Sequence, residues 1–164
     1  MRYVIREQLF RLGEDSAITD ESGNMVFQVD GKVLTLRDRL ILRDQSGQEV
    51  ATVHRRLMAL RPTYEISVHG QPAAQVRKHF FTPFRDKFTI DVPGPDDLEM
   101  TGSLLDHNFT IKRHNDTVAT VSKQWLTFRD TYGVEIAPGE DDALILASVL
   151  ALDLANDRED RQRE

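Results

Sequence analysis

A short motif with one basic residue at a fixed position occurs three times in the chain. Its form is Ala-x-Val-x-(Arg/Lys)-x-(Leu/Phe/Trp), and its copies cover residues 51–57, 74–80 and 119–125. In a β-strand, residues two apart lie on one face, so a valine that faces the core directs the cation inward as well. The cations of the three copies are Arg55, Lys78 and Lys123.

Cations that converge bind phosphate groups through charge-assisted hydrogen bonds. The motif cations and their basic neighbours therefore predict a site for a phospholipid head group or another phosphoanion. These neighbours are Arg56, Arg77, Lys112 and Arg113. Inward cations also have two structural explanations: ion pairs with acids such as Asp130 or Asp153, or a rim position with the charged end in water. The residues that close the motif are expected in the core or at the rim, with membrane insertion as the alternative. They are Leu57, Phe80 and Trp125.

No spacing in the chain indicates a catalytic or metal site. The five histidines form no i, i+4 pair and no His-Glu-x-x-His motif. Ser103, Asp106 and His107 are close in sequence but lack the Gly-x-Ser-x-Gly pattern of a nucleophile elbow. Asp96, Asp97 and Glu99 form an acidic cluster but lack the glycine of an EF-hand. The chain has no Walker loop or dinucleotide fingerprint. We therefore expect a non-enzymatic protein without a cofactor or a bound metal.

The motifs belong to a longer repeat of strand, loop, strand and turn. Eleven or twelve residues after each motif valine comes a strand that begins with an aromatic residue, at Tyr64, Phe88 and Tyr132. The spacing of the valines leaves room for a degenerate copy over residues 98–111, and residues 26–42 resemble an earlier copy. About five units of this kind are expected.

Turn residues support this phasing. Residues 20–23 and 44–47 both place a glycine, where a positive φ is expected, between two apolar runs. Ten or more short strands in one domain favour a closed barrel or a sandwich. A closed barrel has the advantage that no strand edge is left unpaired.

Residues 144–155 break the strand pattern, because ten of these twelve residues are apolar and only Ser148 and Asp153 are not. The preceding acids at 140–142 favour the first turn of a helix. A helix that is apolar on every face must be enclosed, and about 18 Å of helix is too short for the roughly 30 Å bilayer core. We expect this helix inside the barrel and no transmembrane span. A lone buried carboxylate is costly, so Asp153 should have a hydrogen-bond partner.

Composition limits the class of protein. With 164 residues, of which 40% are hydrophobic, the chain can form one domain with a sizeable core. The net charge is −6, and five of these charges fall in residues 137–164, so no nucleic-acid partner is expected. Cysteine is absent, and the start of the chain shows no apolar run typical of a signal peptide. We expect a cytoplasmic monomer, peripheral to the membrane if it binds lipid.

Three segments together resemble the LURP-one-related family of the tubby C-terminal-like superfamily. They are Val-Ala-Thr-Val-Ser-Lys-Gln-Trp at 118–125, Asp-Thr-Tyr-Gly-Val-Glu-Ile at 130–136 and Asp-Ala-Leu-Ile-Leu-Ala at 142–147. A typical member has lysine where Gln124 stands. The resemblance implies a mainly β fold: a closed antiparallel β-barrel of about 12 strands around one hydrophobic C-terminal α-helix. The domain would span residues 1–155, with its core helix at about 141–155 and a flexible polar tail at 156–164.

The resemblance also bears on function, because tubby relatives bind phosphoinositides and scramblase relatives act at phospholipid membranes. The leading expectation is a non-enzymatic binding or scaffold module for anionic phospholipid or another phosphoanion. The alternative is a soluble protein–protein interaction or regulatory module, in which the acidic tail contacts a basic partner. A hydrolase site that the sequence does not reveal is the third and weakest alternative.

Overall fold

The computed structural model describes most of the chain. It covers residues 1–7, 15–30, 39–56, 63–79, 85–124 and 130–163, and the side chains from residue 159 onward are outside the description. The residues that close the repeated motif, Leu57, Phe80 and Trp125, lie outside the described residues.

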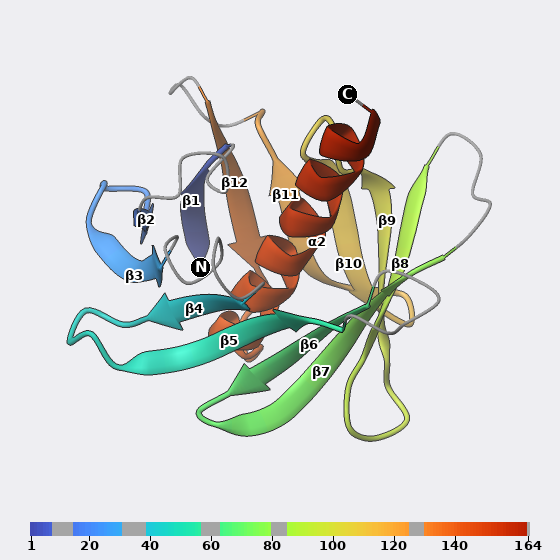
Figure 1. Cartoon of the computed structure of the whole chain (residues 1–164), viewed down its shortest axis with the longest axis horizontal. Helices are drawn as coiled ribbons and strands as arrows, with labels where there is room; N and C mark the ends of the chain where they lie inside the picture. The colour runs from blue at the N-terminus through green and yellow to red at the C-terminus, as the bar shows by residue number, and fades with distance from the viewer. Residues whose placement is uncertain (8–14, 31–38, 57–62, 80–84, 125–129, 164) are drawn as a thin grey trace.

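The strands of the described residues form one closed antiparallel barrel (Figure 1). Each strand pairs with its neighbours along the chain, and β1 pairs with β12 to close the sheet. The prediction of a closed barrel of about 12 strands is confirmed. The strands are β1 (Arg2–Arg6), β2 (Ser16–Thr19), β3 (Met25–Asp30), β4 (Arg39–Arg43), β5 (Glu49–Arg55), β6 (Thr63–Val68), β7 (Gln71–Lys78), β8 (Asp86–Asp91), β9 (Leu98–Ser103), β10 (Asn108–Arg113), β11 (Asp116–Ser122) and β12 (Thr131–Ile136).

The predicted repeat corresponds to hairpins of the barrel. Its five units are β3–β4, β5–β6, β7–β8, β9–β10 and β11–β12. The β1–β2 hairpin is a sixth unit that the repeat pattern does not reveal. In β1, Ile5 takes the place of the motif valine and Glu7 takes the place of the cation. β2 has only four residues, and its register with β1 consists of the single pair Val4–Thr19.

The aspartate–glycine turns form as their sequence predicts. After β2, the Oδ1 atom of Asp20 accepts the N–H groups of Ser22 and Asn24, both at 2.9 Å. Gly23 has a φ of 84°, in the left-handed region that favours glycine. The turn after β4 repeats this arrangement around Asp44. These turns fix the register of the hairpins they join.

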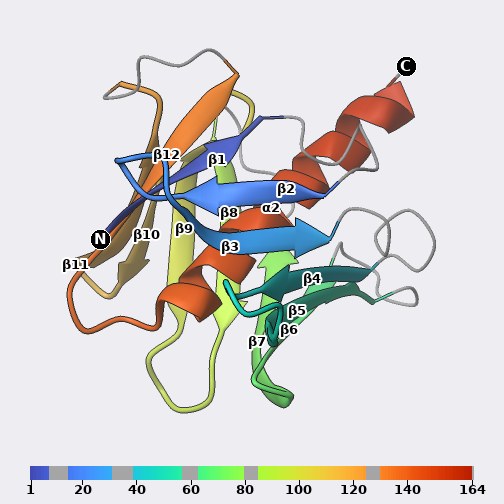
Figure 2. The same ribbon diagram turned by 90° about the vertical axis from the view of Figure 1, so that its left-hand side faces the viewer.

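The helix α2 (Asp142–Arg163) runs through the barrel (Figures 1 and 2). Its start is capped by Asp141, whose Oδ1 atom accepts the N–H of Leu144 at 3.2 Å. The hydroxyl of Tyr3 on β1 donates to the Asp142 carboxylate at 2.5 Å, which ties the helix start to the wall. The negative charge of these acids is favourable at a helix N-terminus.

The helix is longer than its sequence predicts. The core helix was expected at about 141–155, whereas α2 continues to Arg163, so residues 156–163 of the predicted flexible polar tail are helical. This segment contains no glycine, proline or β-branched residue, so nothing in it stops the helix.

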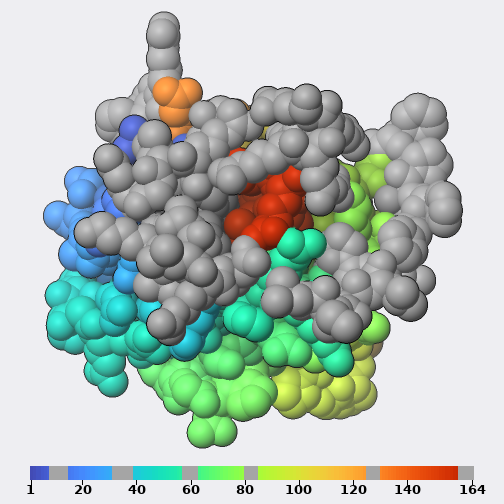
Figure 3. Space-filling view, viewed as in Figure 1, coloured from blue at the N-terminus to red at the C-terminus, as the bar shows by residue number. Residues whose placement is uncertain are grey.

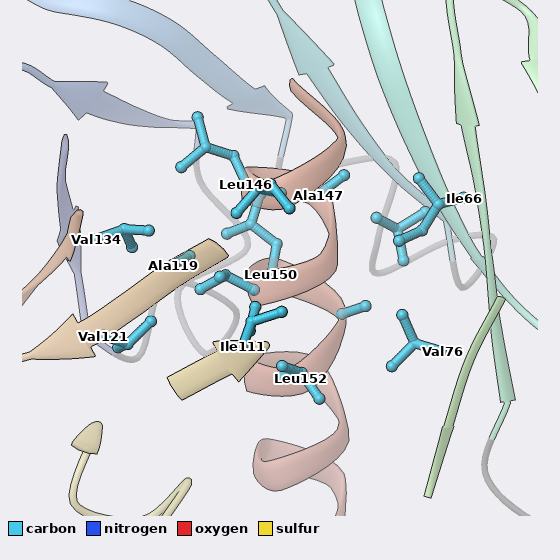
Figure 4. Packing of buried hydrophobic residues seen from close by; sticks show 14 of the residues in the cluster. Ile66, Val76, Ile111, Ala119, Val121, Val134, Leu146, Ala147, Leu150 and Leu152 are labelled. Carbon is cyan, nitrogen blue, oxygen red and sulfur yellow. The ribbon is translucent and has the colours of Figure 1, made fainter. Parts of the chain in front are cut away.

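The apolar part of α2 fills the barrel. Leu146, Leu150 and Leu152 are fully buried, and they pack among inward side chains of the wall such as Ile66 and Val121 (Figure 4). Buried residues therefore occur all round the helix, as expected for a helix enclosed by a sheet. Burial of each such side chain contributes about 1.5–3 kcal/mol relative to exposure. The core that results positions the polar residues at the barrel ends.

Candidate functional site

The two ends of the barrel differ, because all odd-numbered strands of an antiparallel sheet run in one direction. These strands finish at the same end, from Arg6 of β1 to Ser122 of β11. We call it the exit end, because the C-terminal end of α2 leaves the barrel there (Figure 2). The opposite end, where the even-numbered strands finish, is the turn end. The motif occurs in β5, β7 and β11, which are all odd-numbered strands, so its cations lie at one end, the exit end.

Arg55 and Lys78 are the last residues of β5 and β7, and both lie on the inner face of the sheet. Arg55 pairs directly with Tyr64, and Lys78 pairs directly with Phe88. Both aromatic residues are buried in the core. Since directly paired residues share a face, the two cations point toward the barrel interior above the apolar core. Both are half-buried.

Arg55 and Arg56 have no carboxylate partner among the described residues. Arg56 follows β5, is exposed, and donates its backbone N–H to the carbonyl of Thr63 at 2.9 Å. β5, β6 and β7 also pack against α2. Figure 3 shows a part of α2 uncovered on one face of the molecule, beside atoms coloured as the chain near β5. This sector of the exit end combines positive charge with an accessible helix surface.

The other predicted site residues do not join this sector. Arg77 lies near the end of β7 but is exposed, and its Nη2 atom is 2.5 Å from Oδ2 of Asp91. Arg113 donates two hydrogen bonds to the Glu140 carboxylate, at 2.8 and 3.0 Å, at the turn end. Lys112 precedes it and is exposed on the outer wall. The seven predicted cations are thus spread over both ends of the barrel.

Lys123 is neutralised by an acid from the far end of the sequence. Its Nζ atom contacts the Glu7 carboxylate, and Oε1 of Glu7 is 3.8 Å from Nδ1 of His107. Glu7, directly after β1, stands at the position where three other hairpins carry the motif cation, and it faces Lys123, the cation directly after β11. The sequence suggested Asp130 or Asp153 as partners of the cations, whereas Lys123 pairs with Glu7.

Asp153 of α2 is held by two groups of the barrel wall. Its Oδ1 atom is 3.0 Å from Nε2 of His107, and its Oδ2 atom accepts the Tyr132 hydroxyl at 3.0 Å. The rings of His107 and Tyr132 stack with their centroids 4.3 Å apart. The predicted partner of Asp153 is confirmed. Glu7 and His107 are the members of this network that sequence reasoning missed, although the position of Glu7 after Ile5 in the strand repeat is a usable signal.

The network has no features of a catalytic or metal site among the residues that the structure describes. The hydroxyl of Ser103 donates to Asp106 at 2.9 Å, while His107 is bonded to Asp153, so serine and histidine do not form a nucleophile–base pair. The described ranges contain no group of three or more histidine, aspartate or glutamate side chains placed to hold a metal ion. The arrangement instead fastens α2 to β10, β12 and the end of β1.

Two buried tyrosines, Tyr3 and Tyr132, should make the stability of the fold vary with pH in the alkaline range. Burial and then the Asp153 carboxylate raise the pKa of Tyr132 well above its usual value, and burial with the Asp142 hydrogen bond raises the pKa of Tyr3. Above pH ~10, these phenols ionise in the unfolded chain but stay protonated in the fold, so the unfolded state binds fewer protons. We expect the free energy of unfolding to fall as the pH rises above about 10.

Urea unfolding at a series of pH values measures this effect. The Tyr3→Phe/Tyr132→Phe variant should lose less stability than the wild type between pH 9 and 11, roughly the range in which free tyrosine ionises. Equal losses for the two proteins would show that these phenols are not responsible.

Comparison with known proteins gives the chain its family. A model of the LURP-one-related family matches residues 1–153. The chain belongs to the LURP-one-related family. It is 30% identical over 150 residues to "Uncharacterized protein YxjI" of Bacillus subtilis, covering 92% of this chain and 90% of that protein. It is 26% identical to "Protein LURP-one-related 6" of Arabidopsis thaliana, covering 86% of this chain and 81% of the relative.

The same fold is found in a protein whose structure has been solved. An X-ray structure of a protein from Arabidopsis thaliana superimposes with a TM-score of 0.69 at 20% identity. The match covers 94% of this chain and 91% of that one. Nothing in the family assignment indicates an enzyme. In the part of the chain that the structure describes, we find no helix with the length and apolar character needed to cross a membrane.

Proposed function

We propose that the protein is a non-enzymatic binding module of the LURP-one-related family that recognises a phosphate-bearing anion at its exit end. Arg55 and Lys78 are the proposed contacts on the inner face, and Arg56 is the contact at the rim. The observation that carries the proposal is the contrast between the cations. Arg55 and Arg56 have no acid partner among the described residues, whereas Arg77, Arg113 and Lys123 each contact a carboxylate.

The electrostatics of the chain agree with a local site. Residues 1–136 carry 19 acids and 18 bases, so the barrel as a whole has no field that would attract anions. An anion must therefore be bound by individual side chains. Arg55 and Lys78 are half-buried, where charge-assisted hydrogen bonds are stronger than they are in open water. Binding should weaken at high salt, because part of the site remains solvent-accessible.

Two binding assays test the proposal and separate a soluble ligand from a lipid. The first measures inositol hexakisphosphate by calorimetry, and the second measures flotation with liposomes that contain phosphoinositides. The Arg55→Gln/Lys78→Gln variant should bind about ten- to a hundredfold more weakly in whichever assay the wild type is positive. Lys123 is left unchanged in this variant, because its replacement would also remove the partner of Glu7.

A matched control keeps the net charge equal. The Lys87→Gln/Lys112→Gln variant also loses two positive charges, but on the outer wall of the barrel, and it should bind like the wild type. Equal binding by the wild type and the Arg55→Gln/Lys78→Gln variant would contradict the site. A wild type that binds neither probe would contradict the proposed function and would favour the protein–protein interaction module instead.

A further inference from the structure

The order of the strands fixes which part of the wall each side of α2 faces. In a closed ring of twelve strands, β5 lies across the barrel from β11, and β10 and β12 flank β11. The Asp153 carboxylate contacts His107, which precedes β10, and Tyr132 of β12. This side of α2 therefore faces the sector around β11, and the opposite side faces β5 and its neighbours.

Arg158 lies on the side of α2 that faces β5. Successive residues of an α-helix are about 100° apart, so Arg158, five residues after Asp153, is about 140° round the helix from it. By the same count, Arg158 is within about 20° of Ala147. Figure 4 shows Ala147 on the side of the helix toward Ile66 of β6, with Val134 across the helix. Arg158 thus continues the face of α2 that packs against β5, β6 and β7.

Arg158 also lies just beyond the apolar core, as do the proposed anion contacts. Arg55 and Lys78 each come two residues, or about 7 Å, after a buried motif valine. Arg158 comes three residues, or about 4.5 Å, after Ala155, the last buried residue of α2 whose side chain the structure describes. All three basic residues are half-buried. The helix and the wall therefore both carry a cation at the level where this sector of the core ends.

The two sides of the helix end carry opposite charges in its described part. Asp157 is one turn beyond Asp153, so it lies on the side of His107 and Tyr132, whereas Arg158 lies on the side of β5. Figure 3 shows part of α2 uncovered beside atoms coloured as the chain near β5. An anion that enters this sector therefore meets the basic side of the helix.

We propose that Arg158 completes the anion site from the helix, so that a bound phosphate group joins α2 to the barrel wall. Its guanidinium donates charge-assisted hydrogen bonds to the phosphate across the site from Arg55 and Lys78. Because the ligand then holds the polar end of α2, residues 156–163 open less often when the anion is bound. This inference rests on the proposed function, since it adds a contact to the same site.

Calorimetry with inositol hexakisphosphate tests the contact. The Arg158→Gln variant should bind about three- to tenfold more weakly than the wild type. Glutamine is a good helix former, so α2 should persist, and chemical unfolding checks that stability is kept. The matched control is Lys112→Gln, which removes one positive charge from the outer wall and should bind like the wild type. Equal affinities of Arg158→Gln and the wild type would overturn the contact and leave the site of Arg55 and Lys78 standing. A wild type that does not bind would overturn both.

Hydrogen exchange of backbone amides tests the link between the anion and the helix. In the wild type, saturating inositol hexakisphosphate should slow the exchange of residues 156–163 several-fold and leave the turn at 44–48 unchanged. In Arg158→Gln, measured at a concentration that also saturates this variant, the slowing at 156–163 should be lost. A purely structural role of Arg158 would not produce this difference. Slowing that is equal in the two proteins, or absent from both, would overturn the proposed role of Arg158.

Discussion

The Gly102→Ala variant is expected to lose about 3 kcal/mol or more of unfolding free energy. Gly102 lies in β9 with a φ of 142°, a conformation that L side chains rarely adopt. A Cβ atom at this position would lie 2.5 Å from the Asn108 carbonyl oxygen and 2.6 Å from the Phe109 Cα atom. Both atoms belong to the backbone of β10, so they move only if the hairpin does. Chemical denaturation of the two proteins measures the loss.

Gly70 supplies the matched control for this variant. It also has a positive φ, 77°, but beyond its two chain neighbours no atom lies within 4 Å of the added Cβ. Gly70→Ala should therefore show the backbone strain alone, about 1 kcal/mol. Equal stability of the two alanine variants would contradict a steric clash between the added Cβ at Gly102 and the backbone of β10.

The Asp153→Ala variant is expected to lose about 3 kcal/mol of unfolding free energy. The substitution removes one carboxylate and leaves two buried groups without their partner, the Tyr132 hydroxyl and Nε2 of His107. Asp153 links α2 to the barrel wall at the exit end, so the substitution weakens the contact between the helix and the sheet. Thermal and chemical unfolding would both report it.

Tyr132→Phe provides the comparison for Asp153→Ala. It removes one of the two hydrogen bonds and leaves the His107 contact in place, so it should cost about 1 kcal/mol. A double-mutant cycle of the two positions would give their coupling free energy. A cost for Asp153→Ala no larger than that for Tyr132→Phe would contradict the role of the network.

The architecture follows from the sequence because the repeat period equals two strands. Residues such as Val53, Val76 and Val121 recur at equivalent places, so one motif fixes the phase of several hairpins and the direction of their cations. The sequence also indicates the helix, because residues 144–155 are apolar at almost every position and would be apolar on every face of a helix. Two features were not predictable: the β1–β2 hairpin, whose β2 strand is very short, and the end of α2, where polar helix formers give no stop signal.

The candidate site was predictable only in part. The motif places Arg55, Lys78 and Lys123 at one end, but it contains no information on which cation faces an acid. Glu7 reaches Lys123 because β1 closes the barrel against β12, a contact between opposite ends of the sequence. His107, in the turn before β10 and with a φ of 46°, contacts Asp153 of α2, 46 residues further along the chain. Neither contact can be inferred from the spacing of residues.

The location of the anion site is tested most directly by nuclear magnetic resonance. In a titration of the isotope-labelled protein with inositol hexakisphosphate, we expect amide and side-chain signals to shift at the ends of β5 and β7, around Arg55 and Lys78. The signals of residues 44–48 and 114–115, at the turn end, should stay in place. Shifts concentrated at the turn end, or a spectrum that does not change, would contradict a phosphate-binding site at the exit end of the barrel.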